Sequence, residues 1–194
     1  MISRRKGDEI IVGVWSNGVH SNGLSFLREE FSEKKHMALE DRLPWGRTIG
    51  EELTAPTHIY LPAIKELIER MDMVAGSANK VIHGMVHITG GGLSKLRELL
   101  PRSKDLDIEV GAWNSLPAMN IFRYVQSEFC VPSSEMYKRF NNGIGYVVAM
   151  DSKYAHEAAK VIGNRFRVEM IGFVVKGSGK VRIESAYEKK TVEY

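Results

Sequence analysis

Two glycine-rich loops hold the residues whose types and spacing could do chemistry. They are Ser16-Asn17-Gly18-Val19-His20-Ser21-Asn22-Gly23 and His87-Ile88-Thr89-Gly90-Gly91-Gly92. Each loop lies between an apolar run and a helix-like run, so its backbone N–H groups are expected at a helix N-terminus, where the helix dipole favours an anion. One such loop is a weak signal, because glycine also serves turns and C-caps. Two loops that carry hydroxyl, amide and imidazole groups favour a site for a phosphorylated ligand.

The side chains of the loops leave a structural interpretation open beside the functional one. The first loop offers several neutral donors and His20, whose imidazole can titrate near pH 7. A turn that only needs glycine and polar residues would have the same composition. In the second loop, Thr89 precedes three glycines, which allow a backbone to approach a ligand closely. Neither loop matches the GxxxxGK[ST] phosphate loop or the GxGxxG dinucleotide motif.

Histidine spacing raises the alternative of a metal site. His83 and His87 are four residues apart and share one face of a helix or strand. With His20 they could form a zinc site, but no thiolate or obvious further ligand accompanies them, so we expect no metal. We interpret His87, next to Thr89, as a site residue and His83 as part of a packed strand.

Two further polar segments also have two interpretations. Asn141 and Asn142 lie in a glycine-bearing turn, which is either a hairpin entry or a source of amides for a ligand. Thr57 and His58 precede the clearest helix of the chain, where they either cap it or line a site. The alternating carboxylates Asp105, Asp107 and Glu109 are predicted to form a solvated strand face.

Apolar periodicity predicts the elements that position these loops. The expected strands are 10–15, 81–88, 145–150, 168–175 and 181–184. The expected helices begin near residue 23 and cover residues 61–71, 93–100, 119–129 and 155–162. Pro62 suits the first turn of the second helix, and Pro101 ends the third. Residues 32–45 are predicted to be an irregular surface excursion. This order of elements predicts a mixed α/β domain.

Length, composition and charge set the broad class. A chain of 194 residues with 43% hydrophobic and 26% charged residues fits a single domain, residues 1–194. The net charge of +3 has no basic stripe, which argues against nucleic acid. No segment approaches the roughly 20 apolar residues of a membrane span. The single cysteine, Cys130, excludes an internal disulfide and fits a reducing compartment, so we expect a soluble cytoplasmic protein.

In their order and spacing, these segments resemble the aminoimidazole ribonucleotide synthetase (phosphoribosylformylglycinamidine cyclo-ligase) family over nearly the whole chain. The segments that carry the resemblance are Gly7-Asp8, Gly18–Gly23, Pro56–Tyr60, His87–Leu93, Trp113–Phe122, Glu135-Met136, Phe140–Gly145 and Ile171-Gly172. The resemblance is to the C-terminal half of that enzyme. It implies an α/β (α+β) domain with a mixed sheet flanked by helices.

The resemblance also implies an activity and its partners. In the family, ATP phosphorylates an amide oxygen of formylglycinamidine ribonucleotide, and an amidine nitrogen then closes the imidazole ring. A preceding domain carries most of the ATP site, its magnesium ligands and the main dimer contact. We therefore expect a phosphorylated small-molecule substrate, an ATP-binding N-terminal half or partner chain that this chain lacks, and a homodimer. ATP and magnesium would be bound mainly by that other half, and no cofactor is expected in this chain alone.

By the same resemblance, His20 and His87 are the expected hydrogen-bonding or proton-handling groups. The residues expected to hold substrate or phosphate are Ser21, Asn22, Gly23, Thr89, Gly90, Gly91 and Gly92, with Thr57, Tyr60 and Asn141 lining the site.

The chain departs from the family pattern at several positions, including Leu61-Pro62, where the family usually has Val-Lys after the tyrosine. Asn17 replaces the usual serine, His58 the usual arginine and Asn142 the usual methionine. A neutral histidine lacks the fixed charge and fork of arginine. This leaves two alternatives: a relative with an altered substrate, such as thiamine phosphate, selenide or a hydrogenase-maturation substrate, or a non-catalytic module that binds a phosphorylated ligand.

Overall fold

The structure is a computed structural model that describes residues 9–111 and 119–194. The segments around Gly7-Asp8 and Trp113 therefore lie outside the described residues. The strands are β1 (Glu9–Trp15), β2 (Ile82–His87), β3 (Leu106–Val110), β4 (Ile144–Asp151), β5 (Val168–Lys176), β6 (Val181–Glu184) and β7 (Thr191–Glu193). The α-helices are α1 (Leu24–Arg28), α2 (Ile49–Leu53), α3 (Leu61–Ala75), α4 (Asn120–Glu128), α5 (Ser133–Arg139) and α6 (Ser152–Gly163). A π-helix, η1 (Glu29–Lys34), and two 3₁₀-helices, η2 (Ala78–Lys80) and η3 (Gly92–Leu99), complete the set.

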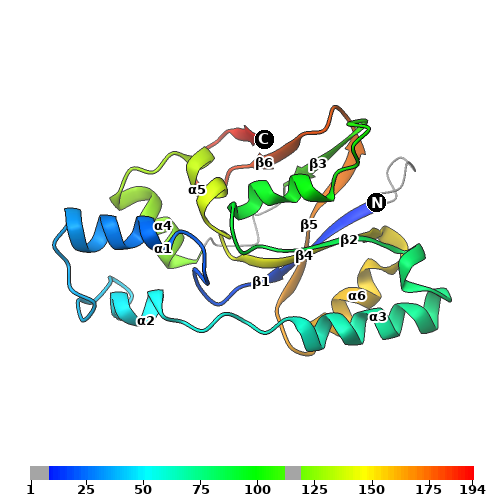
Figure 1. The fold of residues 1–194 in the computed structure, drawn as a ribbon, viewed down its shortest axis with the longest axis horizontal. Coiled ribbons are helices and arrows are strands. Elements are labelled where there is room, and N and C mark those ends of the chain that lie inside the picture. Colours follow the sequence, from blue (N-terminus) through cyan, green and yellow to red (C-terminus); the bar gives the residue numbers. More distant parts are fainter. Residues whose placement is uncertain (1–8, 112–118) are drawn as a thin grey trace.

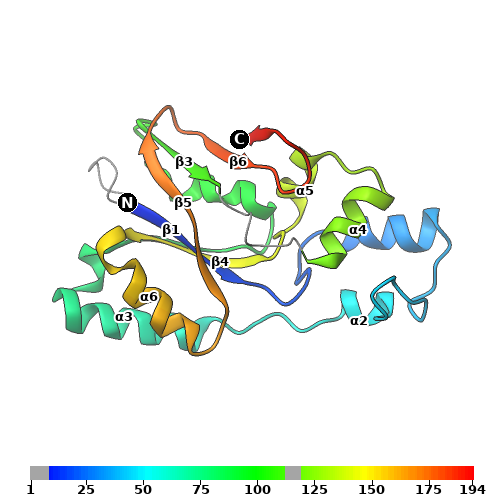
Figure 2. The same cartoon turned by 180° about the vertical axis from the view of Figure 1, so that it is seen from behind.

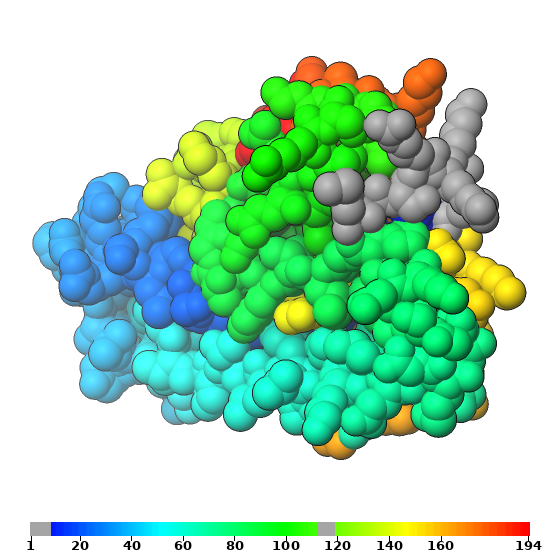
Figure 3. All heavy atoms as spheres, turned by 45° about the vertical axis from the view of Figure 1, so that its right-hand side comes forward, coloured from blue at the N-terminus to red at the C-terminus, as the bar shows by residue number. Residues whose placement is uncertain are grey.

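One seven-stranded sheet organises the chain, in the order β2-β4-β1-β5-β3-β6-β7. All neighbouring strands are antiparallel except β3 and β6, which are parallel. Helices α3 and α6 cover one face of the sheet, and η3 and α5 lie on the other (Figures 1 and 2). Seen from the side, α3 and the segments from β2 to η3 lie next to one another on the surface (Figure 3). The predicted mixed sheet flanked by helices is confirmed.

Strand β1 is buried on both faces because its side chains alternate between two cores. Ile10, Val12 and Val14 pack with α3 and α6, whereas Ile11 packs with η3 and α5. Gly13 leaves room for the opposite strands, since a Cβ there would lie 2.9 Å from Ile171. Strand β1 is thus held between β4 and β5, and the loop that follows it starts from a buried strand.

A third core lies beyond the end of the sheet, among α1, η1, α2, α4 and α5 (Figure 1). Leu27, Phe31 and Phe122 are fully buried in it. The prediction of an irregular surface excursion over residues 32–45 is wrong in part: η1 continues to Lys34, and Leu43 is buried in this core. The apolar side chains of the segment are too far apart to show a period.

The predicted elements are otherwise confirmed within a few residues. The helix after the second loop is a 3₁₀-helix, and it ends before Pro101 as expected. Pro62 lies in the first turn of α3. The elements that the sequence did not predict are α2, α5, β7 and the 3₁₀-helix η2. Each has seven residues or fewer, which is too short for a clear apolar period. None of the described helices is long and apolar enough to cross a membrane.

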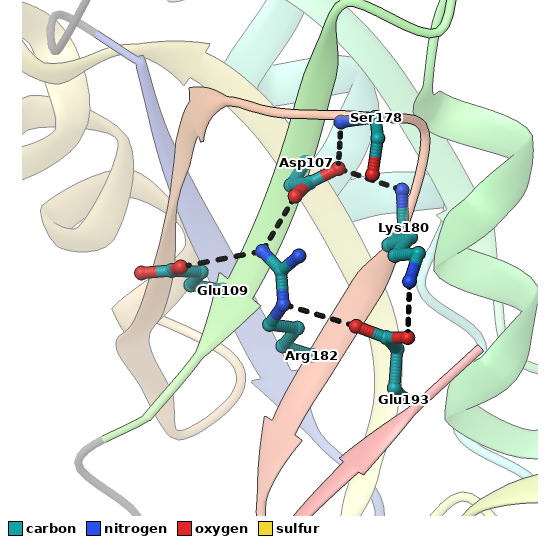
Figure 4. Close-up of polar contacts among 6 residues, drawn as sticks. All are labelled: Asp107, Glu109, Ser178, Lys180, Arg182 and Glu193. Atoms are coloured by element: carbon teal, nitrogen blue, oxygen red, sulfur yellow. Dashed lines mark hydrogen bonds and ion pairs between the residues drawn. The ribbon is translucent and has the colours of Figure 1, made fainter.

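Asp107 corrects the predicted solvated face of β3, which was otherwise recognised as strand-like. Its side chain is buried, whereas Glu109 is exposed as predicted. The carboxylate accepts the N–H groups of Ser178 (2.7 Å) and Lys180 (2.8 Å), and the Arg182 guanidinium lies 2.5 Å away (Figure 4). Burial opposes ionisation, but these donors outweigh it and lower the pKa of Asp107. Asp107 therefore closes the turn between β5 and β6.

We expect Asp107→Asn to lower the free energy of unfolding by about 2–3 kcal/mol, because the amide loses charge-assisted bonds and turns N–H groups toward donors. Since the pKa of Asp107 is lower in the folded state, its contribution is complete above the unfolded pKa near 3.8 and is lost as the pH falls through the folded value. Urea unfolding from pH 7 to pH 2 measures both effects. Glu109→Gln, an exposed carboxylate two residues further along the same strand, is the control and should change stability little. Equal losses in both variants would contradict this role.

Candidate functional site

The first glycine loop joins β1 to α1, as the sequence predicted. Gly23 precedes α1 in the left-handed region, with φ 71°. A Cβ on Gly23 would lie 2.2 Å from the Phe140 ring, so glycine is required for both conformation and space. His20 also has a positive φ, 53°, which is uncommon for a residue with a side chain. The loop backbone therefore has a positive φ at both His20 and Gly23, a conformation that few residue types adopt readily.

The second loop joins β2 to η3. Gly91 and Gly92 have φ 76° and 52°, and a Cβ on Gly92 would lie 2.4 Å from the Tyr137 carbonyl oxygen. Gly90 and Gly91 are exposed, and a Cβ on Gly90 would meet no atom within 4 Å. The outer part of the loop is thus open to a ligand, while Gly92 anchors it to α5.

Lys95 is a residue of the second loop region that the sequence analysis missed. Its Nζ donates to the His87 carbonyl at 3.2 Å and to Thr89 Oγ1 at 3.3 Å. Lys95 lies three residues after Gly92, in the helix that the loop begins, and a basic residue at that spacing is the signal that could have identified it. It places one positive charge beside the open glycines.

Hydrogen bonds bring the two loops together. Asn22 Nδ2 donates to the carbonyl of Ile88 in the second loop at 2.9 Å. Asn141, from the third polar segment, donates to the Gly18 and Val19 carbonyls at 3.0 and 3.1 Å. Both asparagines are buried. The Asn141 amide thus fastens the first loop to the start of β4 and is a support behind the loop.

A cluster of rings lies where the loops meet. The Tyr60 ring centroid is 6.2 Å from that of His20 and 5.5 Å from that of His87. His58 packs edge-on against His20 at 5.9 Å, and Tyr60 donates from its hydroxyl to the Trp15 carbonyl at 2.8 Å. Three histidines that are distant in the sequence are therefore neighbours.

The three histidines are held neutral. Burial, followed by the nearby His58 and His87, lowers the pKa of His20 to about 4. Burial also lowers the pKa values of His58 and His87, and the positive charge of Lys95 lowers the pKa of His87 further. Near pH 7 these rings act as neutral donors or acceptors, and His58 does not supply the charge of an arginine. Among the described residues, no group of three or more His, Cys, Asp or Glu side chains could hold a metal ion.

Several buried polar atoms at the junction of the loops have no hydrogen-bond partner. Within residues 9–111 and 119–194, they include His20 Nδ1, Asn22 Oδ1 and His87 Nε2. Buried polar groups are nearly always paired, so unpaired ones need an explanation such as a bound group or water. All three belong to the two glycine loops, which marks this junction as a candidate ligand site.

The remaining candidate residues lie at different depths. Ser21 and Thr57 are exposed, and Thr89 is half-buried. Thr57 and His58 do not cap α3, because the residue at the cap is Tyr60. His83 lies in β2 with its Nδ1 2.5 Å from Glu9, consistent with a packed strand.

Asn142, which departs from the family pattern, has a structural explanation. Its φ is 50°, its Nδ2 donates to the Met136 and Phe140 carbonyls, and its Oδ1 accepts the Tyr187 hydroxyl at 2.6 Å. Asparagine tolerates this left-handed conformation better than methionine does. Asn142 and Tyr187 thus tie the third polar segment to the C-terminal part of the chain.

The fold and the paired loops define a class: a mixed α/β domain whose candidate ligand site lies between two strand-to-helix glycine loops. A family model described as AIR synthase related protein, C-terminal domain, matches residues 5–184. The chain belongs to this family.

Curated relatives agree with this assignment. The chain is 33% identical over 189 residues to a phosphoribosylformylglycinamidine cyclo-ligase of Methanococcus vannielii, covering 97% of this chain and 49% of that protein. It is 36% identical over 175 residues to the protein of the same name from Bacillus cytotoxicus, covering 88% of this chain and 46% of that protein. The chain therefore spans about half the length of these relatives.

Solved structures support the fold alone. HypE in a HypE–HypF complex matches with a TM-score of 0.60 at 18% identity, covering 98% of this chain and 53% of that chain. T. maritima PurL complexed with FGAR matches with a TM-score of 0.52 at 15% identity, covering 97% and 27%.

Proposed function

We propose that this chain is the substrate side of an ATP-dependent cyclo-ligase of purine biosynthesis, which converts formylglycinamidine ribonucleotide to aminoimidazole ribonucleotide. In this proposal, ATP and magnesium are bound mainly by an ATP-binding half. The reaction transfers the γ-phosphoryl group to the amide oxygen of the substrate. An amidine nitrogen then attacks the activated carbon, phosphate leaves with that oxygen, and the ring closes. Aminoimidazole ribonucleotide, ADP and phosphate are the products.

One observation carries the proposal: the two glycine loops meet at His20 and His87 in a chain that is 33–36% identical to proteins named as cyclo-ligases. The exposed glycines Gly90 and Gly91 and the Lys95 ammonium suit the phosphate of a ribonucleotide. The neutral imidazoles suit the reacting end, whose amide and amidine groups carry N–H donors. Phosphoryl transfer is catalysed largely by positioning and electrostatic stabilisation, which such a site can supply.

A second candidate is a module that binds a phosphorylated ligand without catalysis. The residue that favours it is His58. Burial lowers the pKa of His58, so the site lacks a fixed cation at this position. Both candidates require a phosphorylated ligand at the loops, and they differ only in turnover.

Titration with aminoimidazole ribonucleotide tests ligand binding on the chain alone. We expect its addition to shift the backbone amide signals of residues 21–23 and 89–92 in NMR spectra, because those N–H groups would contact the phosphate. The dephosphorylated nucleoside is the control and should shift them much less. Equal responses to both compounds, or shifts only elsewhere, would contradict a phosphate site at the loops.

A further inference from the structure

Asn17 links the His20 ring to the segment that precedes α3. Its Nδ2 donates to the Pro56 carbonyl at 2.9 Å, and its Oδ1 lies 2.6 Å from His20 Nε2. Asn17 is half-buried and lies next to the site. A single amide therefore contacts both the imidazole and the segment that carries His58 and Tyr60.

The Pro56 contact fixes which way the Asn17 amide points. A carbonyl oxygen only accepts, so the atom that faces Pro56 must be the amide nitrogen. The reversed amide would place two acceptor oxygens 2.9 Å apart. The oxygen of Asn17 must then face His20.

The position of the imidazole proton follows from this orientation. Asn17 Oδ1 and His20 Nε2 are 2.6 Å apart, which is favourable only if a proton lies between them. The Asn17 backbone N–H also points toward Nε2 and would favour the opposite tautomer, but that contact is 3.4 Å long. The short bond outweighs the long one, and Nε2 carries the proton.

We propose that Asn17 is a positioning residue that holds His20 in the Nε2–H tautomer, so that the buried Nδ1 is left as a hydrogen-bond acceptor. The chemical consequence rests on the proposed function. A bare Nδ1 accepts an N–H group, such as that of an amidine, and repels a phosphate oxygen. His20 thus belongs to the reacting end of the substrate.

Two further observations agree with this assignment. His20 is 4% exposed, and its Nδ1 is buried without a partner among the described residues. Asn22 lies two residues later, and its orientation is also fixed, because its Nδ2 donates to the Val19 and Ile88 carbonyls. Its unpaired Oδ1 is a second buried acceptor of the same loop.

The two loops therefore suit different chemical groups of a ligand. The first loop presents neutral acceptors for N–H groups, whereas the open glycines and Lys95 of the second loop suit an anion. The groups around His20 are His58, Tyr60 and His87, which are uncharged near pH 7. Because Nδ1 is covered, contact with a ligand requires a neighbouring side chain to move.

The test is the tautomer of His20 in the intact chain, labelled with ¹⁵N-histidine. Two-bond ¹H–¹⁵N spectra near pH 7 distinguish a protonated from a bare ring nitrogen, and His20→Gln assigns the signals. We expect a bare Nδ1 and a protonated Nε2. Asn17→Ala removes the Oδ1 acceptor but keeps the backbone N–H, so the proton should move to Nδ1. A protonated Nδ1 in the unaltered chain, or the same tautomer in Asn17→Ala, would overturn the proposal.

Asn17→Asp is the second variant and decides the matter if Asn17→Ala does not fold. Its carboxylate keeps an acceptor at Nε2, so the tautomer should persist while the His20 pKa rises. An unchanged pKa, or a neutral ring that carries its proton on Nδ1, would overturn the proposal.

These spectra need no turnover, so a failed cyclo-ligase assay would leave the tautomer result intact. If the chain turns over with an ATP-binding half, Asn17→Ala should lower kcat on the order of 10²-fold, with the KM for ATP unchanged.

Discussion

Gly92→Ala is expected to destabilise the chain by about 2–5 kcal/mol and to abolish binding of a phosphorylated ligand at the second loop. Gly92 has φ 52°, where alanine is disfavoured by about 1–2 kcal/mol. Its Cβ would also lie 2.4 Å from the Tyr137 carbonyl oxygen and 2.5 Å from that of Phe140. These are backbone atoms, so relief requires a shift of α5 or the loop, which adds about 1–3 kcal/mol. Since domains are stable by only about 5–15 kcal/mol, much of the chain would unfold at moderate temperature.

Gly90→Ala is the matched control, two residues earlier in the same loop. Its φ is not positive, and an added Cβ would meet no atom within 4 Å. We expect it to change the free energy of unfolding by less than about 0.5 kcal/mol. Urea unfolding of both variants measures the difference. A Gly92→Ala chain as stable as Gly90→Ala would show that the loop is not anchored on α5 as described.

His20→Gln should lower kcat on the order of 10²-fold when the chain is combined with an ATP-binding half. The imidazole is buried, neutral and adjacent to His58 and His87, and glutamine does not reproduce the positions of both ring nitrogens. Its pKa, about 4 in the folded state, implies that activity supported by the neutral ring persists to about pH 5. Steady-state rates from pH 5 to pH 8 measure both effects.

His156→Gln serves as the control for this prediction, because His156 is exposed on α6. It should leave kcat unchanged. A circular dichroism spectrum and thermal unfolding curve must show that His20→Gln is folded. If folded His20→Gln has the rate of His156→Gln, His20 does not act at the reacting end.

The sequence predicted most of the elements because their apolar periods are long. The continuous apolar run of β1 reflects a strand that is buried on both faces, and the spacing of Ile64, Leu67 and Met71 in α3 reflects burial of one helix face against the sheet. The two glycine loops could also be located, since each lies between a strand and a helix. Spacing alone predicted only a phosphorylated ligand at these loops, and the family resemblance added the expected substrate and reaction.

Other features depend on contacts between distant residues and leave no local signal. Asp107 looks like a solvated carboxylate until the turn at Ser178 and Lys180 folds over it. Asn141 looks like a ligand amide, but it supports the backbone of the first loop from 122 residues away. The link from Asn17 to Pro56 is likewise invisible in the sequence. Which polar residues face a ligand and which support the loop is decided by tertiary structure.

Reconstitution with an ATP-binding half tests the central claim most directly. The half must support turnover with the C-terminal half of a cyclo-ligase relative, which serves as the positive control. Formylglycinamidine ribonucleotide labelled with ¹⁸O in its amide is added with ATP and magnesium. We predict aminoimidazole ribonucleotide, ADP and ¹⁸O-labelled phosphate only when both chains are present. Absence of all three products, with the positive control active, would contradict the assignment of this chain as the substrate side of a cyclo-ligase.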